Sequence, residues 1–349
     1  MSEFRTIREL CSVVVDCPHS TPKWTANGKI VIRNKNIKHG KIDFSSPSYT
    51  DDEHFAQRIK RAKPQPGDII ITREAPIGDV GMIPENTECC LGQRMVLLRA
   101  NQSVCDNFYL LYSLQSLYVQ HQISWSEGTG TTVSNLRIPH LEQIQIPYLP
   151  LEQQAKISSV LRALEEKIEN NRRLNDNLMQ QAVAIFKSWF VEYSPFDGIA
   201  PKEWKTVNLE KITALICRGI APKYSDNSNQ TVINQKCIRD HMIDLSQART
   251  HTPKVINEKW LRFGDLLINS TGDGTLGRTA QVWFQPQNIT VDSHVTIVRP
   301  AKENLIFYIG LWGILHEREI ECLHTGSTGQ TELPKERVKA LELHLPDNG

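Results

Sequence analysis

The 349-residue chain lacks the patterns that mark many enzymes and membrane proteins. Its eight cysteines form no C-x-x-C pair and no zinc-ligand quartet, so we expect free thiols in a reducing compartment. No apolar run approaches the roughly 18 residues of a membrane span. No apolar segment follows Met1–Arg5 to complete a signal peptide. These absences predict a cytoplasmic protein without a membrane partner.

Catalytic motifs are also missing. The sequence contains no G-x-S-x-G elbow, no H-E-x-x-H helix and no N/D-P-P-[FYW] motif of an amino-methyltransferase. The segment Gly272–Thr279 approaches a phosphate-binding loop, but Arg278 stands in place of the required lysine. The following residues, Ala280–Phe284, predict a strand rather than the required helix, which favours a glycine-rich hairpin. We therefore expect a binding subunit that is not an enzyme and holds no metal.

The chain instead contains a long internal duplication. Val31–Asp43 returns as Val232–Asp244 with six of thirteen residues identical. Gly67–Ile71 returns as Gly264–Ile268, and Thr129-Gly130 as Thr328-Gly329. An offset of about 200 residues is far longer than the roughly 20–50 residues of a solenoid repeat, so it indicates a duplicated domain. Two similar domains in one chain suit two sites on one long partner.

Net charge does not identify that partner, because the chain carries only +1 overall. Local charge is more informative. Six bases and no acid lie between Cys17 and Ile42. Such a run is typical either of a solvated loop or of a surface that faces phosphates.

A long helix is predicted between the two copies, from Leu151 to about Phe190. Apolar and small positions alternate in steps of four and three, as in a coiled-coil seam with a polar centre. We call these positions the helix seam: Ile157, Leu161, Leu164, Ile168, Asn171, Asn175, Leu178, Ala182, Ile185 and Trp189. The seam predicts a second helix as partner; the alternative is burial against the helix's own domains. About 40 residues make a rod of about 60 Å.

The copies themselves predict short strands with few helices. Val31-Ile32, Asp68–Ile71, Met95–Leu98, Asp265–Ile268 and Val295–Val298 read as strands, whereas Asn107–Gln120 and Asn304–Glu321 read as helices. The predicted fold is α+β, with two similar mixed-β domains at 1–150 and 194–349 and a coiled-coil-type helix at 151–193.

Two stretches resemble a known family. Gly67–Gly78 with Leu91–Arg94 is similar to the target recognition domain of type I restriction–modification specificity (S) subunits. Pro150–Gln154, Leu164–Asn175 and Phe186–Phe190 resemble the central conserved helix of that family. The resemblance covers the whole chain in order. The second conserved helix of the family is expected after the second domain, where this sequence reads Leu345–Gly349, so we expect a shortened form whose helix self-associates.

The resemblance implies that each recognition domain reads half of a bipartite DNA site. Double-stranded DNA, modification (methyltransferase) subunits that methylate adenine and a restriction (motor–nuclease) subunit are the implied partners. S-adenosylmethionine, ATP and Mg²⁺ are implied on those partners, with no cofactor in this chain. The helix length caps the distance between half-sites at about 17 base pairs, at roughly 3.4 Å each.

Residues for DNA contact follow from the basic segment, the arginines and the hydroxyl-rich loops, because arginine suits guanine edges and lysine suits phosphates. The candidates in the first domain are Lys35, Lys38, Lys41, Arg73, Arg94, Thr129, Thr131 and Thr132. Those in the second are Lys236, Arg239, Arg278, Thr328 and Gln330. Arg73 has a structural alternative, pairing with Glu74 or a core acid. The competing functions are a coiled-coil protein scaffold without specific DNA binding and an enzyme of unrecognised type.

Overall fold

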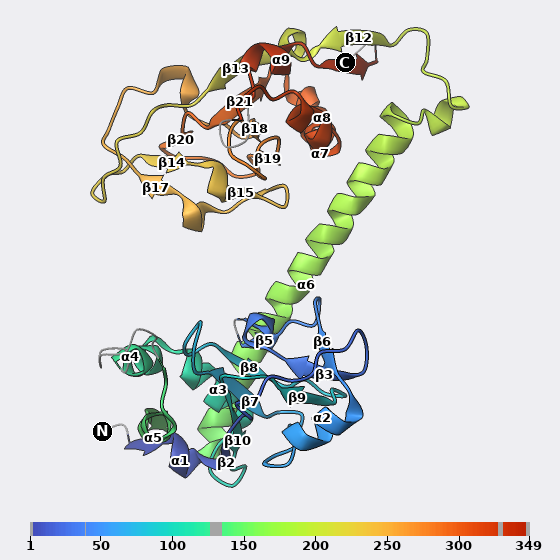
Figure 1. Cartoon of the computed structure of the whole chain (residues 1–349). Helices are drawn as coiled ribbons and strands as arrows, with labels where there is room; N and C mark the ends of the chain where they lie inside the picture. The colour runs from blue at the N-terminus through green and yellow to red at the C-terminus, as the bar shows by residue number, and fades with distance from the viewer. Residues whose placement is uncertain (1–2, 39, 126–134, 327–330, 347–349) are drawn as a thin grey trace. The chain divides into compact units, whose positions relative to one another are not determined.

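A computed structural model describes residues 3–38, 40–125, 135–326 and 331–346. The chain divides into two compact units, Met1–Asn171 and Arg172–Gly349. Both are mixtures of short strands and helices, and one helix of 40 residues, α6, begins in the first unit and ends in the second (Figure 1). The predicted α+β class and the long central helix are confirmed.

The first unit is built on a four-stranded antiparallel sheet in the order β2-β10-β7-β8. A second, three-stranded sheet has the order β6-β3-β9, and β1 pairs with β11. Its strands are β1 (Glu3–Thr6), β2 (Cys11–Asp16), β3 (Lys29–Ile32), β4 (Ile37–Lys38), β5 (Lys41–Ile42), β6 (Ser48–Thr50), β7 (Ile69–Thr72), β8 (Val80–Met82), β9 (Cys89–Leu91), β10 (Met95–Ala100) and β11 (Gln145–Tyr148). Its helices are α1 (Ile7–Leu10), α2 (Asp52–Arg58), α3 (Asn107–Gln115), α4 (Leu117–Trp125), α5 (Ile138–Gln143) and the start of α6 (Leu151–Phe190).

The second unit repeats this plan. The sheet β13-β21-β18-β19 matches β2-β10-β7-β8, the sheet β17-β14-β20 matches β6-β3-β9, and β12 pairs with β22 as β1 does with β11. The strands are β12 (Lys205–Asn208), β13 (Thr213–Arg218), β14 (Thr231–Ile233), β15 (Ile238–Arg239), β16 (Met242–Ile243), β17 (Arg249–Thr250), β18 (Leu266–Asn269), β19 (Thr279–Gln281), β20 (Ile289–Val291), β21 (Val295–Pro300) and β22 (Glu342–Leu345). The helices are α7 (Ile306–Leu315), α8 (Glu317–Cys322) and α9 (Lys335–Lys339). The duplication in the sequence is therefore a duplication of fold.

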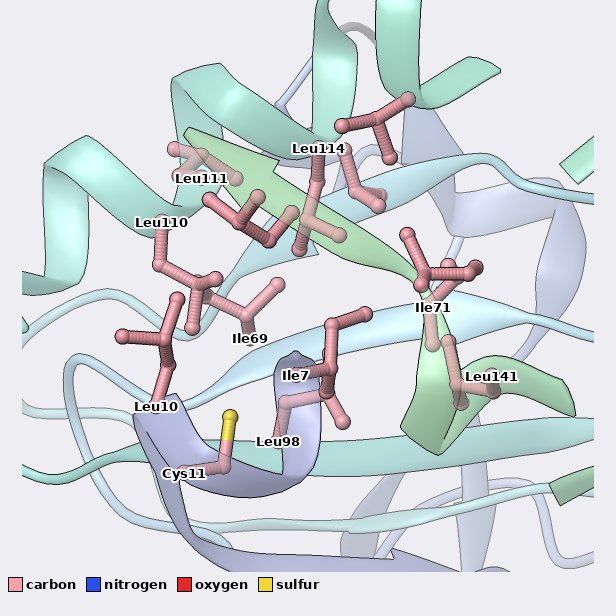
Figure 2. Close-up of a cluster of buried hydrophobic side chains, with 14 of the residues drawn as sticks. Ile7, Leu10, Cys11, Ile69, Ile71, Leu98, Leu110, Leu111, Leu114 and Leu141 are labelled. Atoms are coloured by element: carbon pink, nitrogen blue, oxygen red, sulfur yellow. The ribbon is translucent and has the colours of Figure 1, made fainter. Parts of the chain in front are cut away.

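Ile69–Ile71 of β7 and Met95–Leu98 of β10 are apolar because both faces of these strands are buried. Ile69 and Ile71 point into a core beneath α1, α3 and α5, together with Leu98, Leu110 and other side chains (Figure 2). Ile70, between them, points to the opposite side and packs with Ile32 and Leu97. Side chains alternate along a strand, so a continuous Ile-Ile-Ile run serves two cores at once. Leu266–Ile268 does the same in the second unit.

The aspartate at the start of each of these runs belongs to an ion pair. Arg99 donates from Nε and Nη2 to Asp68 at 2.8 and 2.7 Å. Arg299 donates to Asp265 with the same atoms and the same distances. The aspartate of the repeated Gly-Asp therefore fixes the start of β7 and of β18 through an ion pair.

The predicted helices Asn107–Gln120 and Asn304–Glu321 are each two helices. Ser116 separates α3 from α4 with extended backbone (φ −65°, ψ 148°). Its hydroxyl donates to the carbonyl of Ser113 at 2.6 Å, so a side chain replaces the next helical bond. In the second domain His316 separates α7 from α8, and its ring Nδ1 lies 2.7 Å from the carbonyl oxygen of Trp312. Continuous apolar periodicity did not reveal these breaks.

Helix α6 is attached to the first unit by polar contacts. The buried Gln154 donates to the carbonyls of Val104 and Leu149 and accepts from the backbone of Asp106. Ser158 donates to the Asp106 carboxylate at 2.6 Å. In the second unit the same helix is held by aromatic packing, with Phe186 and Phe190 both about 5 Å from the ring of Tyr308.

Six of the larger seam side chains, Ile157, Leu164, Ile168, Leu178, Ile185 and Trp189, stay 39 to 62% exposed. These six side chains are therefore not buried against the helix's own domains, whereas Leu161 and Ala182 are half-buried. No helix in the described part of the chain is both long and apolar enough to cross a bilayer.

Candidate functional site

A polar cleft opens in the first unit where several strands end. It has a volume of about 410 Å³. Its walls come from the loop after β2, from the start of the segment Asn34–Asn36, and from the loops after β7 and β9. The lining residues are Pro22, Trp24, Arg33, Asn34, Lys35, Ala75, Gly92, Gln93 and Arg94. Two of the predicted DNA contacts, Lys35 and Arg94, thus lie in one cleft.

A buried arginine behind the cleft holds two of its loops together. Arg58 donates to the carbonyls of Leu91 and Gly92 on one side and of Ser20 and Pro18 on the other, at 2.7 to 3.2 Å. Burial lowers the pKa of Arg58. Its guanidinium remains charged at neutral pH and can satisfy several carbonyls from one planar fork. The loop after β2 and the loop after β9 are therefore held in fixed register.

Three bases, Arg33, Lys35 and Arg94, line the cleft, and Glu74 beside it pairs with Arg94. The guanidinium of Arg33 stacks over the ring of Trp24, 5.0 Å from its centre. Arg94 Nε lies 3.2 Å from Glu74 Oε2, and the Arg94 side chain remains 56% exposed. Lys35 Nζ donates to Ser46 at 3.3 Å. The excess of positive charge, with amides of Asn34 and Gln93 beside it, suits phosphates and base edges.

Lys38 and Lys41, two further predicted contacts of the first unit, are engaged within the protein. Lys38 Nζ lies 3.3 Å from Asp43, and hydrogen bonds from Ser45 and then Lys38 lower the pKa of Asp43 to about 2. Lys41 pairs with Glu169 of α6 at 3.4 Å. Both lysines are more than half exposed, so their pairs are weak and exchangeable. They stay predicted contacts.

Arg73 is held more firmly. Its Nη1 donates to both carboxylate oxygens of Asp16 at 2.8 and 2.9 Å, and its Nε donates to the carbonyl of Leu136 at 2.9 Å. The side chain is only 11% exposed. This geometry is the pairing with an acid that the sequence left as the alternative for Arg73, although the acid is Asp16 on β2 rather than Glu74.

In the second unit the predicted bases are spread over several elements. Lys236 lies in the short helix Gln235–Cys237 and Arg239 at the end of β15, both exposed. Arg278 is half-buried and immediately precedes β19, after the glycine-rich turn. That turn joins two antiparallel strands, so the expected hairpin is confirmed. Thr129, Thr131, Thr132, Thr328 and Gln330 lie outside the described residues.

Sequence reasoning missed the four other aromatic and polar residues of the cleft: Trp24, Arg33, Asn34 and Gln93. Arg33 was visible within the basic segment, and Gln93 directly precedes Arg94. Their convergence depends on strands β3 and β9 being parallel neighbours. A non-local pairing of this kind leaves no periodic signal in the sequence.

Comparisons with known proteins agree with this architecture. Residues 3–180 match the family model of the type I restriction modification DNA specificity domain. The specificity subunit of the type I restriction enzyme MjaIX of Methanocaldococcus jannaschii is 25% identical over 259 residues, which are 68% of this chain and 57% of that protein. The EcoKI specificity subunit of Escherichia coli K12 is 22% identical over 346 residues, covering 90% of this chain and 71% of that one.

A solved structure shows the same fold. The S subunit of a type I restriction-modification system from M. genitalium aligns over 99% of this chain and 85% of its own, with a TM-score of 0.59 and 15% identity. The present chain spans little more than half the length of the MjaIX subunit. The family model nevertheless covers more than half of this chain, and its match spans the first unit and part of α6. The chain belongs to the family of type I restriction–modification specificity subunits.

Proposed function

We propose that this subunit recognises a bipartite DNA site, with one half-site bound by each recognition domain. The observation that carries the proposal is the duplicated fold: two copies of the same two sheets follow one another on either side of α6. A repeated DNA-binding unit in one chain requires two half-sites at a fixed separation. The polar cleft of the first unit supplies cations for phosphates and base edges.

In this proposal, modification subunits methylate adenine at the site and a motor–nuclease subunit carries out restriction. S-adenosylmethionine, ATP and Mg²⁺ belong to those partners. The specificity chain itself contributes binding and orientation. Because its net charge is only +1, we expect weak DNA binding by the isolated chain and tight binding by the complex, falling as salt rises.

The exposed helix seam supports a second element of the proposal, a helical partner. Apolar side chains repeated at seven-residue spacing are stable only when a facing helix covers them. We place a second copy of this chain on the seam, joined antiparallel. Asn171 and Asn175 would set the register at the centre of that contact. A scaffold that binds only proteins would share this surface, and the DNA experiment below separates the two.

The test is methyl transfer by the chain with its modification subunits on synthetic duplexes. Once the site is known, two duplex series are compared. One changes the bases between the half-sites, and the other inserts a single base pair there. A bipartite reader tolerates the base changes and loses most activity on insertion, because each base pair adds about 3.4 Å and roughly a tenth of a turn. Equal activity on both series, or methylation without site preference, would overturn the proposal.

A further inference from the structure

Hydrogen bonds give a residue-by-residue correspondence between the cleft of the first domain and the equivalent segments of the second domain. Arg73 donates its backbone N–H to the carbonyl of Arg94, and Ser270 does the same to His294, both at 2.8 Å. Arg73 and Ser270 each follow the central strand of their domain, β7 or β18. Glu74 therefore corresponds to Thr271, and Arg94 to His294.

The third position corresponds as well. Asn34 opens the short helix Asn34–Asn36 after β3, and Gln235 opens the short helix Gln235–Cys237 after β14. Strands β3 and β14 each pair in parallel with β9 or β20, the strand that leads to Arg94 or His294. Three loops thus meet at equivalent places in both domains.

In the first domain these positions hold a connected polar group. Asn34 donates from its side-chain amide to the carbonyl of Glu74 at 2.5 Å. The Glu74 carboxylate then lies 3.2 Å from Arg94 Nε and accepts from Asn135 at 2.8 Å. Glu74 fixes the Nε edge of the guanidinium and leaves the side chain 56% exposed. The outer face of Arg94 thus presents donors only.

In the second domain the same positions hold Gln235, Thr271 and His294, which are joined by side-chain contacts. Thr271 Oγ1 donates to Gln235 Oε1 at 3.1 Å and lies 2.8 Å from His294 Nδ1. A hydroxyl has one proton to donate. When Thr271 donates it to Gln235, the contact with His294 is a hydrogen bond only if His294 Nδ1 carries a proton and donates it to Thr271 Oγ1. Neutral His294 then offers Nε2 as an acceptor, and Gln235 offers its NH₂ as a donor. The two groups differ in chemistry while sharing one location.

Backbone geometry indicates that the first group is more than structural. Arg94 has φ of +66°, in the left-handed region that favours glycine or asparagine. Strain of this kind persists where the surrounding structure enforces it and is concentrated at functional positions. An exposed arginine in such a backbone contributes little to the core.

We propose that Gln235, Thr271 and His294 form the base-reading group of the second domain, the counterpart of Asn34, Glu74 and Arg94 in the first. Arg94 matches the two acceptors of a guanine edge, and the Gln235 amide matches adenine. Thr271 is a positioning residue that orients both of its neighbours. This inference rests on the proposed recognition of DNA and adds which residues read which half of the site.

The experiment maps methylated adenines across the genome of cells that express the chain with its modification subunits. It compares the wild type with Arg94→Ala, Gln235→Ala and Thr271→Val. We expect Arg94→Ala to relax one base position in one half-site only. Gln235→Ala and Thr271→Val are expected to relax the other half-site, with roughly 5- to 150-fold less discrimination at the base concerned.

Matched controls are available in the same chain. Arg8 is exposed and pairs with Glu142 at 3.6 Å, as Arg94 pairs with Glu74. His344 is exposed and lies 3.5 Å from the hydroxyl of Thr206, as His294 contacts Thr271. Arg8→Ala and His344→Ala should leave the methylated sequence unchanged. Thermal unfolding of each purified variant complex shows that it is folded.

The outcomes separate this inference from the function on which it rests. If the wild type gives no gapped site, the proposed bipartite recognition is wrong. If the wild type gives a gapped site, unchanged discrimination in both Gln235→Ala and Thr271→Val overturns the inference alone. Relaxation of the same half-site by Arg94→Ala and Gln235→Ala would overturn it equally.

Discussion

Arg73 and Arg218 arise from different strands of the two domains but donate to equivalent carbonyl oxygens. Arg73 follows β7 and reaches Leu136, whereas Arg218 ends β13 and reaches Leu333, at 2.9 and 2.8 Å. Leu136 and Leu333 correspond, because each donates its backbone N–H to the residue after the central strand. In each domain a guanidinium thus donates to the same backbone carbonyl, although the two arginines occupy different positions in the fold.

This relationship predicts that Arg73 acts through stability. Replacing Arg73 with methionine removes donors from Asp16 and Leu136 in a half-buried site, so we expect a loss of about 1–3 kcal/mol in the free energy of unfolding. Arg61→Met is the control, since Arg61 is exposed and only its Nη1 reaches the Asp16 carbonyl, at 3.4 Å. Urea denaturation measures both. If Arg73→Met had the stability of the wild type but an altered DNA preference, Arg73 would be a base-reading residue.

The equivalent ion pairs of the two domains predict unequal losses in the free energy of unfolding. Arg299 and Asp265 are 7% and 1% exposed, whereas Arg99 and Asp68 are 28% and 3% exposed. Removing one partner of a buried pair leaves an uncompensated charge, so Arg299→Met is expected to cost about 3–5 kcal/mol. Arg99→Met should cost less, because water reaches its site. Equal losses in denaturant titrations of the two variants would contradict this.

Much of the fold could be predicted from the sequence, for physical reasons that particular residues show. The Ile69–Ile71 run reads as a strand because both of its faces are buried, and the copy at Leu266–Ile268 repeats the signal. The seam of α6 is visible because coiled-coil periodicity is local. The cleft was recovered only in part, through Lys35 and Arg94.

The rest depends on contacts between distant segments. Gln235, Thr271 and His294 come from three separate loops, and nothing in the sequence places them together. The breaks at Ser116 and His316 are decided by single side-chain hydrogen bonds within an apolar run. Such decisions are made by tertiary geometry and not by periodicity.

A histidine–carboxylate pair predicts pH-dependent stability of the second domain. The Glu317 carboxylate, 3.2 Å from His241 Nδ1, raises the pKa of that histidine above its ordinary 6.5. Burial raises the pKa of Glu317, but contacts with His241 and Thr279 outweigh it and leave that pKa below 4.5. The histidine's contribution is therefore complete below pH 6.5 and is lost as pH rises through its raised value.

The measurement is the melting temperature of the wild type and of His241→Gln across pH. The difference between the two should be largest below pH 6.5 and shrink as pH rises through the raised pKa of His241. The Glu317→Gln substitution should also reduce this difference in melting temperature, because it removes the carboxylate that stabilises protonated His241. A difference that grows with pH would show that His241 is neutral in the fold.

The seam predicts that one charge can disrupt self-association. Leu164 is 54% exposed on the seam, and neighbouring Ala163 lies on another face of α6. Leu164→Glu should shift the protein from dimer to monomer in sedimentation velocity at micromolar concentration, because it places a carboxylate in the contact. Ala163→Glu adds the same charge and should leave the dimer intact. A wild type that is monomeric would rule out the second copy as partner of the seam.

The central claim is that each recognition domain reads its own half of one DNA site. The most direct measurement is the sequence surrounding methylated adenines in cells that carry this chain with its modification subunits. Two short defined blocks, separated by a constant number of undefined bases, are the predicted result. A single uninterrupted block would contradict the claim.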